Sequence, residues 1–161
     1  MQLLKIYYAY FSPGNTTEKV VSHIASSFQN YPVESINLTD YATRQEDYYF
    51  KENELLIIGV PAYGGRVPAP VVDALRHFTG SNTPVVLVAT YGNRDLDDTL
   101  IELKKNVIDK GFIPVGAASF VCQHTFLKEC AEGRPDEEDL KMAREFGDKL
   151  KERLRLLVTY D

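Results

Sequence analysis

The residues with the clearest chemistry lie in one short segment near the start of the chain. Three hydroxyl side chains, Ser12, Thr16 and Thr17, occur within six residues and are separated by Pro13-Gly14-Asn15. Proline stiffens a loop, whereas Gly and Asn tolerate the positive φ that a tight turn requires. Such a turn can hold a phosphate through hydroxyls and unpaired backbone N–H groups. Because 12–17 contains no Lys or Arg, we expect phosphate binding through neutral donors, with an ordinary helix cap as the alternative.

The sequence on either side of 12–17 predicts the two elements that would position it. Residues 3–11 are rich in Leu, Ile, Tyr and Phe, which indicates a strand. After the segment, apolar residues recur at the spacing of one helical face: Val20, Val21, Ile24, Ala25 and Phe28. The segment would therefore lie between a first strand and a first helix, where the helix dipole favours an anion.

The rest of the chain predicts strands that alternate with helices. Further strands are expected at 33–38, 54–60, 84–90 and 113–121, and helices at 68–78, at 96–108 and from Pro135 onward. Residues 41–53 show no clear period, and we expect a short helix or an irregular crossover there. The continuously apolar runs at 54–60 and 84–90 are typical of strands buried on both faces. This pattern predicts a single α/β domain, 1–161, with a parallel sheet between two layers of helices.

Two more loops follow predicted strands and could face the same ligand. One contains Pro61, Ala62, Tyr63, Gly64, Gly65, Arg66 and Val67. The other contains Thr90, Tyr91, Gly92, Asn93, Arg94 and Asp95. Ligands of open parallel sheets lie beyond the carboxyl ends of the strands, so the three loops can converge. Taken singly, each glycine pair also fits an ordinary turn.

The three loops together would suit a ligand with one phosphate and a wide planar ring. Glycine allows the backbone to approach a flat surface, and the rings of Tyr63 and Tyr91 could stack on a heterocycle. Flavin mononucleotide (FMN) has that shape. A dinucleotide would instead require Gly-x-Gly-x-x-Gly in the first loop, which has a single glycine, Gly14.

Composition excludes several other classes of function. The formal net charge of -5 disfavours nucleic acid and anionic membranes as partners, because both attract basic proteins. Seven residues separate Cys122 from Cys130, a spacing that matches neither a redox CxxC motif nor a zinc site. The sequence shows neither a signal peptide nor a stretch of membrane-spanning length, so we expect a cytoplasmic protein without membrane insertion.

The chain resembles the flavodoxin-like proteins, most closely the flavodoxin portion of bacterial flavodoxin-ferredoxin fusion proteins. The segments that carry the resemblance are 10–13, 59–68, 89–94 and 133–136. It implies a three-layer sandwich with a five-stranded parallel sheet in the order 2-1-3-4-5, and non-covalent FMN. In that pattern Ser12 and 15–17 hold the phosphate, while 61–67 and 90–95 flank the ring. The chain differs from the family at Gly14 and Asn15, where Thr and Gly are usual, and at Leu96, where an aromatic ring is common.

The leading hypothesis is therefore an electron carrier that docks with redox proteins such as a separate ferredoxin or reductase. One alternative is an FMN enzyme that reduces quinones or other small acceptors with NAD(P)H. Another is a binding domain on the same scaffold that has lost flavin. Either a monomer or a homodimer would fit the carrier.

Overall fold

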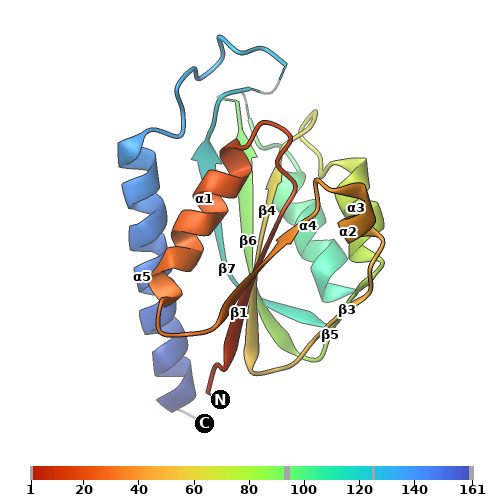
Figure 1. Cartoon of the computed structure of the whole chain (residues 1–161), viewed down its shortest axis with the longest axis vertical. Coiled ribbons are helices and arrows are strands. Elements are labelled where there is room, and N and C mark those ends of the chain that lie inside the picture. The colour runs from red at the N-terminus through yellow and green to blue at the C-terminus, as the bar shows by residue number, and fades with distance from the viewer. Residues whose placement is uncertain (1, 93–94, 125, 160–161) are drawn as a thin grey trace.

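A parallel five-stranded sheet forms the middle layer of the molecule (Figure 1). The computed structural model describes residues 2–92, 95–124 and 126–159. The sheet contains, from edge to edge, β2 (Val33–Asn37), β1 (Lys5–Tyr10), β4 (Glu54–Pro61), β6 (Thr83–Tyr91) and β7 (Phe112–Val121). Counting only these five strands along the chain, the order is 2-1-3-4-5, which confirms the predicted α/β architecture.

The apolar strands divide the core into two halves. In β4, Leu55 and Ile57 point toward one side of the sheet, whereas Leu56 and Ile58 point toward the other. Helices α1 (Thr16–Ala25) and α5 (Glu137–Thr159) cover the first side, and α3 (Ala69–Leu75) and α4 (Thr99–Ile108) cover the second (Figure 1). All residues at 55–60 are buried, as expected for a central parallel strand.

The crossover at 41–53 was only partly predicted. It contains the short helix α2 (Tyr41–Arg44) and the strand β3 (Tyr48–Phe50), which pairs in parallel with β5 (Phe78–Gly80). The helix predicted over 68–78 is therefore wrong at its end, because α3 stops at Leu75 and Phe78 belongs to β5. The rings of Phe50 and Phe78 pack 5.3 Å apart, so contacts with distant residues override the local helical pattern.

Two other helices begin later than predicted. Leu96 precedes α4, whose first residue is Thr99; the Thr99 hydroxyl donates to the carbonyl of Leu96. Helix α5 begins at Glu137 rather than at Pro135. The short 3-10 helix η1 (Ser26–Phe28) continues α1 and buries Phe28. These differences leave the five main strands in place.

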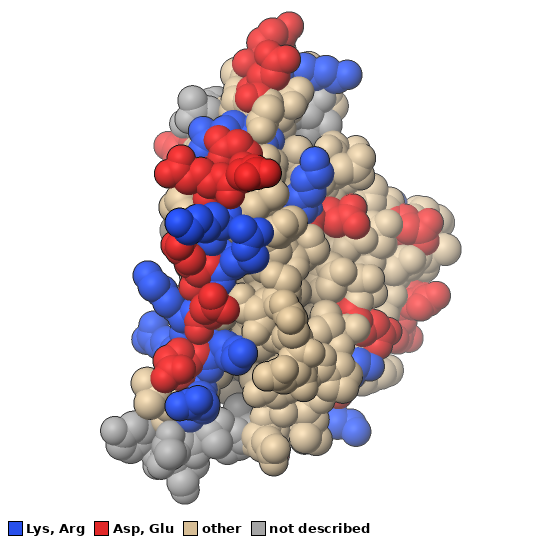
Figure 2. Space-filling model, turned by 60° about the vertical axis from the view of Figure 1, so that its left-hand side comes forward, with Lys and Arg blue, Asp and Glu red and all other residues tan. Residues whose placement is uncertain are grey.

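Helix α5 is long, and its outer surface carries charges of both signs. Figure 2 shows basic and acidic side chains intermingled on this side of the molecule. Two pairs along the helix, Lys141–Glu145 and Glu152–Arg155, are exposed and 3.9 Å apart, so they contribute little to stability. No helix within the described ranges is both long enough and apolar enough to cross a membrane.

Gly59 in β4 allows α1 to pack closely on the sheet. A Cβ at this position would lie 2.1 Å from Cγ2 of Val21, a stiff side chain that is fully buried. We expect Gly59→Ala to lower the free energy of unfolding by about 2 kcal/mol, because the helix must move away. Denaturant unfolding followed by circular dichroism measures this change.

Gly116→Ala in β7 is the matched control. Its Cβ would meet the end of the Leu150 side chain, at 2.8 Å, which can rotate aside. Equal losses of stability in the two variants would contradict the close packing of α1 against Gly59.

Candidate functional site

The loops at the carboxyl ends of four strands line one cavity of about 280 Å³. Residues of the first predicted loop that line it are Ser12, Pro13, Gly14, Thr16 and Thr17. The second and third loops contribute Pro61, Ala62, Tyr63, Gly64, Thr90, Tyr91 and Gly92. A fourth wall, which was not predicted, comes from the segment after β7 and comprises Cys122, Gln123, His124 and Phe126. The structure thus brings the three predicted loops together at one place.

The first loop leaves backbone donors at the start of α1. Asn15 adopts the left-handed conformation with φ 65° that was predicted for it, whereas Gly14 does not. The Ser12 hydroxyl accepts the N–H of Glu18 at 3.0 Å. No hydrogen bond between described residues uses the N–H groups of Thr16 and Thr17, the first two residues of the helix. These two groups remain free to bind an anion.

The hydroxyl groups of this loop also retain donors. A hydroxyl has one hydrogen and two lone pairs, so Ser12 can still donate while it accepts from Glu18. The hydroxyls of Thr17 and Thr90 lie 2.8 Å apart in a single hydrogen bond, which leaves one hydrogen of the pair unused. The Cys122 thiol lies beside Thr16, and burial raises its pKa to about 12, so it stays neutral. This end of the cavity offers neutral donors, as the sequence predicted.

The second loop is a tight turn that requires its glycines. The backbone groups of Tyr63 and Arg66 exchange two hydrogen bonds, of 2.9 and 3.0 Å, and Gly64 and Gly65 both have positive φ. A Cβ at Gly65 would lie 2.5 Å from a carboxylate oxygen of Asp97. The glycine therefore lets the loop before α4 pack directly against this turn.

Several predicted site residues lie away from the cavity. Arg66 forms an ion pair with Glu102 on α4, and Val67 is buried in the core between the sheet and α3. The Asp95 carboxylate accepts the N–H of Leu96 at 2.7 Å and stabilises its own loop. Asn15 and Gly65 shape their turns without lining the cavity. The remaining two, Asn93 and Arg94, lie outside the described residues.

Aromatic rings form another part of the cavity wall. The Tyr63 ring lies between Phe11 and Phe126, with centroids 6.1 and 6.0 Å away. Phe126 is 75% exposed, although it lines the cavity. Tyr91 contributes a further ring from the end of β6. The cavity thus offers flat apolar surfaces in addition to its hydrogen-bond donors.

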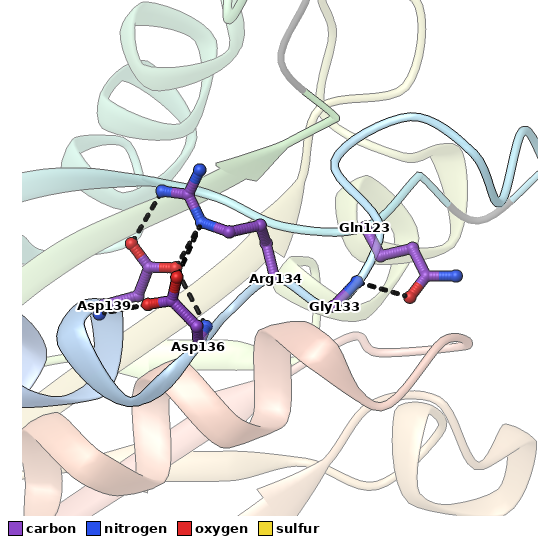
Figure 3. A network of polar contacts seen from close by, with 5 residues as sticks. All are labelled: Gln123, Gly133, Arg134, Asp136 and Asp139. Carbon is purple, nitrogen blue, oxygen red and sulfur yellow. Dashed lines mark hydrogen bonds and ion pairs between the residues drawn. The ribbon is translucent and has the colours of Figure 1, made fainter.

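The fourth wall is held in place by an ion-pair network at the start of α5 (Figure 3). Arg134 donates two hydrogen bonds to the Asp139 carboxylate, one of them 2.7 Å long. Asp136 and Asp139 each accept the other's backbone N–H at 2.9 Å, a reciprocal cap of the helix. Gln123 lies across the loop and accepts the N–H of Gly133 at 3.4 Å. This network connects Gln123 with residues 133–136 and fixes those residues to the start of α5.

The sequence contained a signal for this wall. Residues 133–136 carried part of the family resemblance and Pro135 was expected to begin the last helix, but they were assigned no part in the ligand site. Two carboxylates spaced as Asp136 and Asp139, directly before an apolar helical stripe, predict a helix cap. The orientation of His124 and Phe126 toward the cavity had no comparable signal, because irregular loops lack periodicity.

Comparisons with known proteins agree with this geometry. No family model and no curated protein sequence matches the chain. Among solved structures, a flavodoxin from the domain Archaea matches with 15% sequence identity and a TM-score of 0.64. The match covers 94% of this chain and 99% of the archaeal flavodoxin chain. The flavodoxin of Streptococcus pneumoniae TIGR4 matches with 12% sequence identity and a TM-score of 0.63. That match covers 92% of this chain and 99% of the flavodoxin chain. The chain has the flavodoxin fold.

A larger protein contains the same fold as one part. Rubredoxin oxygen:oxidoreductase from the anaerobe Desulfovibrio gigas is 15% identical with a TM-score of 0.66. The match covers 96% of this chain but 37% of that enzyme. At these identities the likeness establishes the flavodoxin fold alone.

Asp139 should stabilise the protein in a pH-dependent way. The hydrogen bonds from Arg134 hold the pKa of Asp139 below its ordinary value of 3.8. A lowered pKa in the folded state means that the contribution is complete above about pH 4 and is lost as the pH falls through the folded pKa. We expect Asp139→Asn to cost about 2 kcal/mol near neutral pH and less in acid.

Urea unfolding across this pH range tests the expectation. Glu138→Gln, an exposed carboxylate in the same helical turn, is the control and should change stability by less than about 0.5 kcal/mol. A stability difference between wild type and Asp139→Asn that stays constant down to strong acid would contradict the role of the ionised carboxylate.

Proposed function

We propose that the chain binds FMN non-covalently in this cavity and acts as an electron carrier. One observation carries the proposal: hydroxyl donors, a helix N-terminus and aromatic rings, from loops far apart in the sequence, line one cavity. The cavity lies at the carboxyl ends of the strands, where open parallel sheets bind ligands, and this location supports the proposal.

The residues present fit the phosphate of FMN. Ser12, Thr16 and Thr17 all line the cavity, and α1 begins at Thr16. They offer neutral donors: the backbone N–H groups of Thr16 and Thr17 and the hydroxyls of Ser12 and Thr16. A helix N-terminus favours negative charge, so a phosphate can be held there without a basic side chain. Within the described part of the chain the lining residues include no Lys or Arg, in keeping with one phosphate rather than a pyrophosphate.

The residues present also fit a wide planar ring. Tyr63 and Phe126 provide adjacent aromatic surfaces, and Tyr91 lies at the end of the neighbouring strand. Gly64 leaves open space beside its backbone, since a Cβ there would meet nothing within 4 Å. A flat ligand can therefore lie close to the second loop.

In this proposal the protein positions the flavin and shields it, and FMN supplies the electron chemistry when bound. The exposed Phe126 ring and the open mouth of the cavity would leave an edge of the ligand accessible to a docking protein. The resemblance to flavodoxin-ferredoxin fusion proteins supports a separate ferredoxin or a reductase as the redox partner. We favour a carrier over an NAD(P)H-dependent reductase because the lining residues that the structure describes offer no basic side chain for a second set of phosphates.

Titration with FMN tests the proposal and the role of Thr16. Wild type should bind FMN with submicromolar affinity and quench its fluorescence. Thr16→Val keeps the side-chain shape but removes the hydroxyl, and we expect it to weaken binding by about 2 kcal/mol, the scale of a hydrogen bond to a charged group. Thr16→Ser, which retains the hydroxyl, should bind almost as tightly as wild type.

Two controls separate phosphate binding from general damage. Ser22→Ala removes a hydroxyl from the same helix, where it donates to the carbonyl of Lys19, and should leave FMN affinity unchanged. Riboflavin lacks the phosphate, so its affinity should not respond to Thr16→Val. Absence of FMN binding by wild type would overturn the proposed function, and steady consumption of NADH with a quinone would favour the reductase instead.

A further inference from the structure

His124 has a fixed orientation at the mouth of the cavity. Its Nδ1 atom accepts the backbone N–H groups of Phe126 and Leu127, at 3.1 and 3.0 Å. The backbone N–H of His124 donates to the backbone carbonyl of Cys130 at 3.0 Å and so helps to hold this loop. The ring lies directly over Gly92, where a Cβ would come within 2.7 Å of the His124 Cδ2 atom. The imidazole is therefore packed against Gly92 on one side and held by the backbone of Phe126 and Leu127.

These contacts decide which nitrogen carries the proton. Because Nδ1 accepts two hydrogen bonds, the neutral ring must carry its hydrogen on Nε2. Among the described residues, no hydrogen bond is formed by Nε2 of His124, although the side chain lines the cavity. The structure thus provides an oriented donor that no described residue accepts from.

We propose that His124 is a ligand-binding residue that donates its Nε2–H to an acceptor atom on the edge of the planar ring. The inference rests on the proposed function and adds a residue from outside the three predicted loops. Donation requires a carbonyl oxygen or an unprotonated ring nitrogen at this edge, and the oxidised flavin ring carries both. The small size of Gly92 allows the imidazole to approach the third loop, as a larger residue there would displace it.

The alternative is that His124 only caps its own loop. In that case the two bonds to Nδ1 would be its whole contribution, and the fourth wall would need them whether or not a ligand is bound. The two roles use different nitrogen atoms, so substitutions that replace one nitrogen at a time can separate them.

The test compares FMN titrations of wild type, His124→Asn and His124→Gln. The Asn side chain can place an oxygen near the Nδ1 position and so keep the acceptor, but it does not reach the Nε2 position. The Gln side chain can place an N–H near the Nε2 position but loses the acceptor. We expect His124→Asn to weaken FMN binding about tenfold and His124→Gln to weaken it less than about threefold.

Riboflavin separates this contact from the phosphate site. The loss caused by His124→Asn should be the same with riboflavin as with FMN, because the ring is common to both. Phenylalanine fluorescence is too weak for Phe126 to report on binding. The second, independent readout is therefore ¹⁵N NMR of the His124 ring. The ligand-free protein should show the tautomer protonated at Nε2, and added FMN should slow the exchange of that hydrogen with water.

Each outcome supports or overturns the inference. Loss of affinity in His124→Asn with retention in His124→Gln, together with the protected Nε2–H, supports it. Wild-type affinity in His124→Asn, or a ring protonated at Nδ1 in the ligand-free protein, overturns it and leaves the proposed function intact. A wild-type protein that binds no FMN overturns both.

Discussion

The structure depends on the burial of its central parallel strands on both faces. Side chains of β4 and β6 alternate between two halves of the core, so a slip of one residue would move each of them to the opposite layer. The pairing of Ile58 with Leu87 and of Pro61 with Thr90 follows from this constraint. Because the register is fixed, β1, β4 and β6 end close to one another at the same edge of the sheet, and their loops meet at one cavity.

The cavity wall has two kinds of surface: hydrogen-bond donors at the start of α1, and aromatic rings. The start of α1 leaves N–H groups unpaired because a helix cannot satisfy them internally, and Ser12 takes only the one on Glu18. The aromatic wall exists because Tyr63 precedes a tight turn and packs between Phe11 and Phe126. The described lining residues of both surfaces include no Asp, Glu, Lys or Arg, so the cavity itself adds no negative charge that would repel a phosphate.

The sequence predicted the parts of the molecule that periodicity and turn chemistry control. Continuous apolar runs such as 54–60 identified the buried strands, and Ser12 with Thr16 and Thr17 identified the helix start at the cavity. Phe78 was misassigned to a helix because its pairing partner, Phe50, lies far away in the sequence. A local pattern cannot report such a contact.

The direction of individual side chains in loops was also beyond prediction. Arg66 was expected at the ligand site but pairs with Glu102, whose position depends on how α4 packs. His124 had no assigned role in the loop after the last strand, and only the arrangement of the chain shows its Nδ1 occupied and its ring in the cavity wall. Electrostatic partners and loop orientation are set by tertiary structure rather than by neighbouring residues.

The central claim is that loops from four strand ends form one ligand site. The most direct measurement is a two-dimensional amide NMR spectrum of the protein titrated with FMN. We expect the signals of Thr16, Gly64, Gly92 and His124 to shift together and to saturate with a single affinity. Shifts confined to another part of the surface, such as the polar depression around Ser27 and Arg144, or no shifts at all, would contradict it.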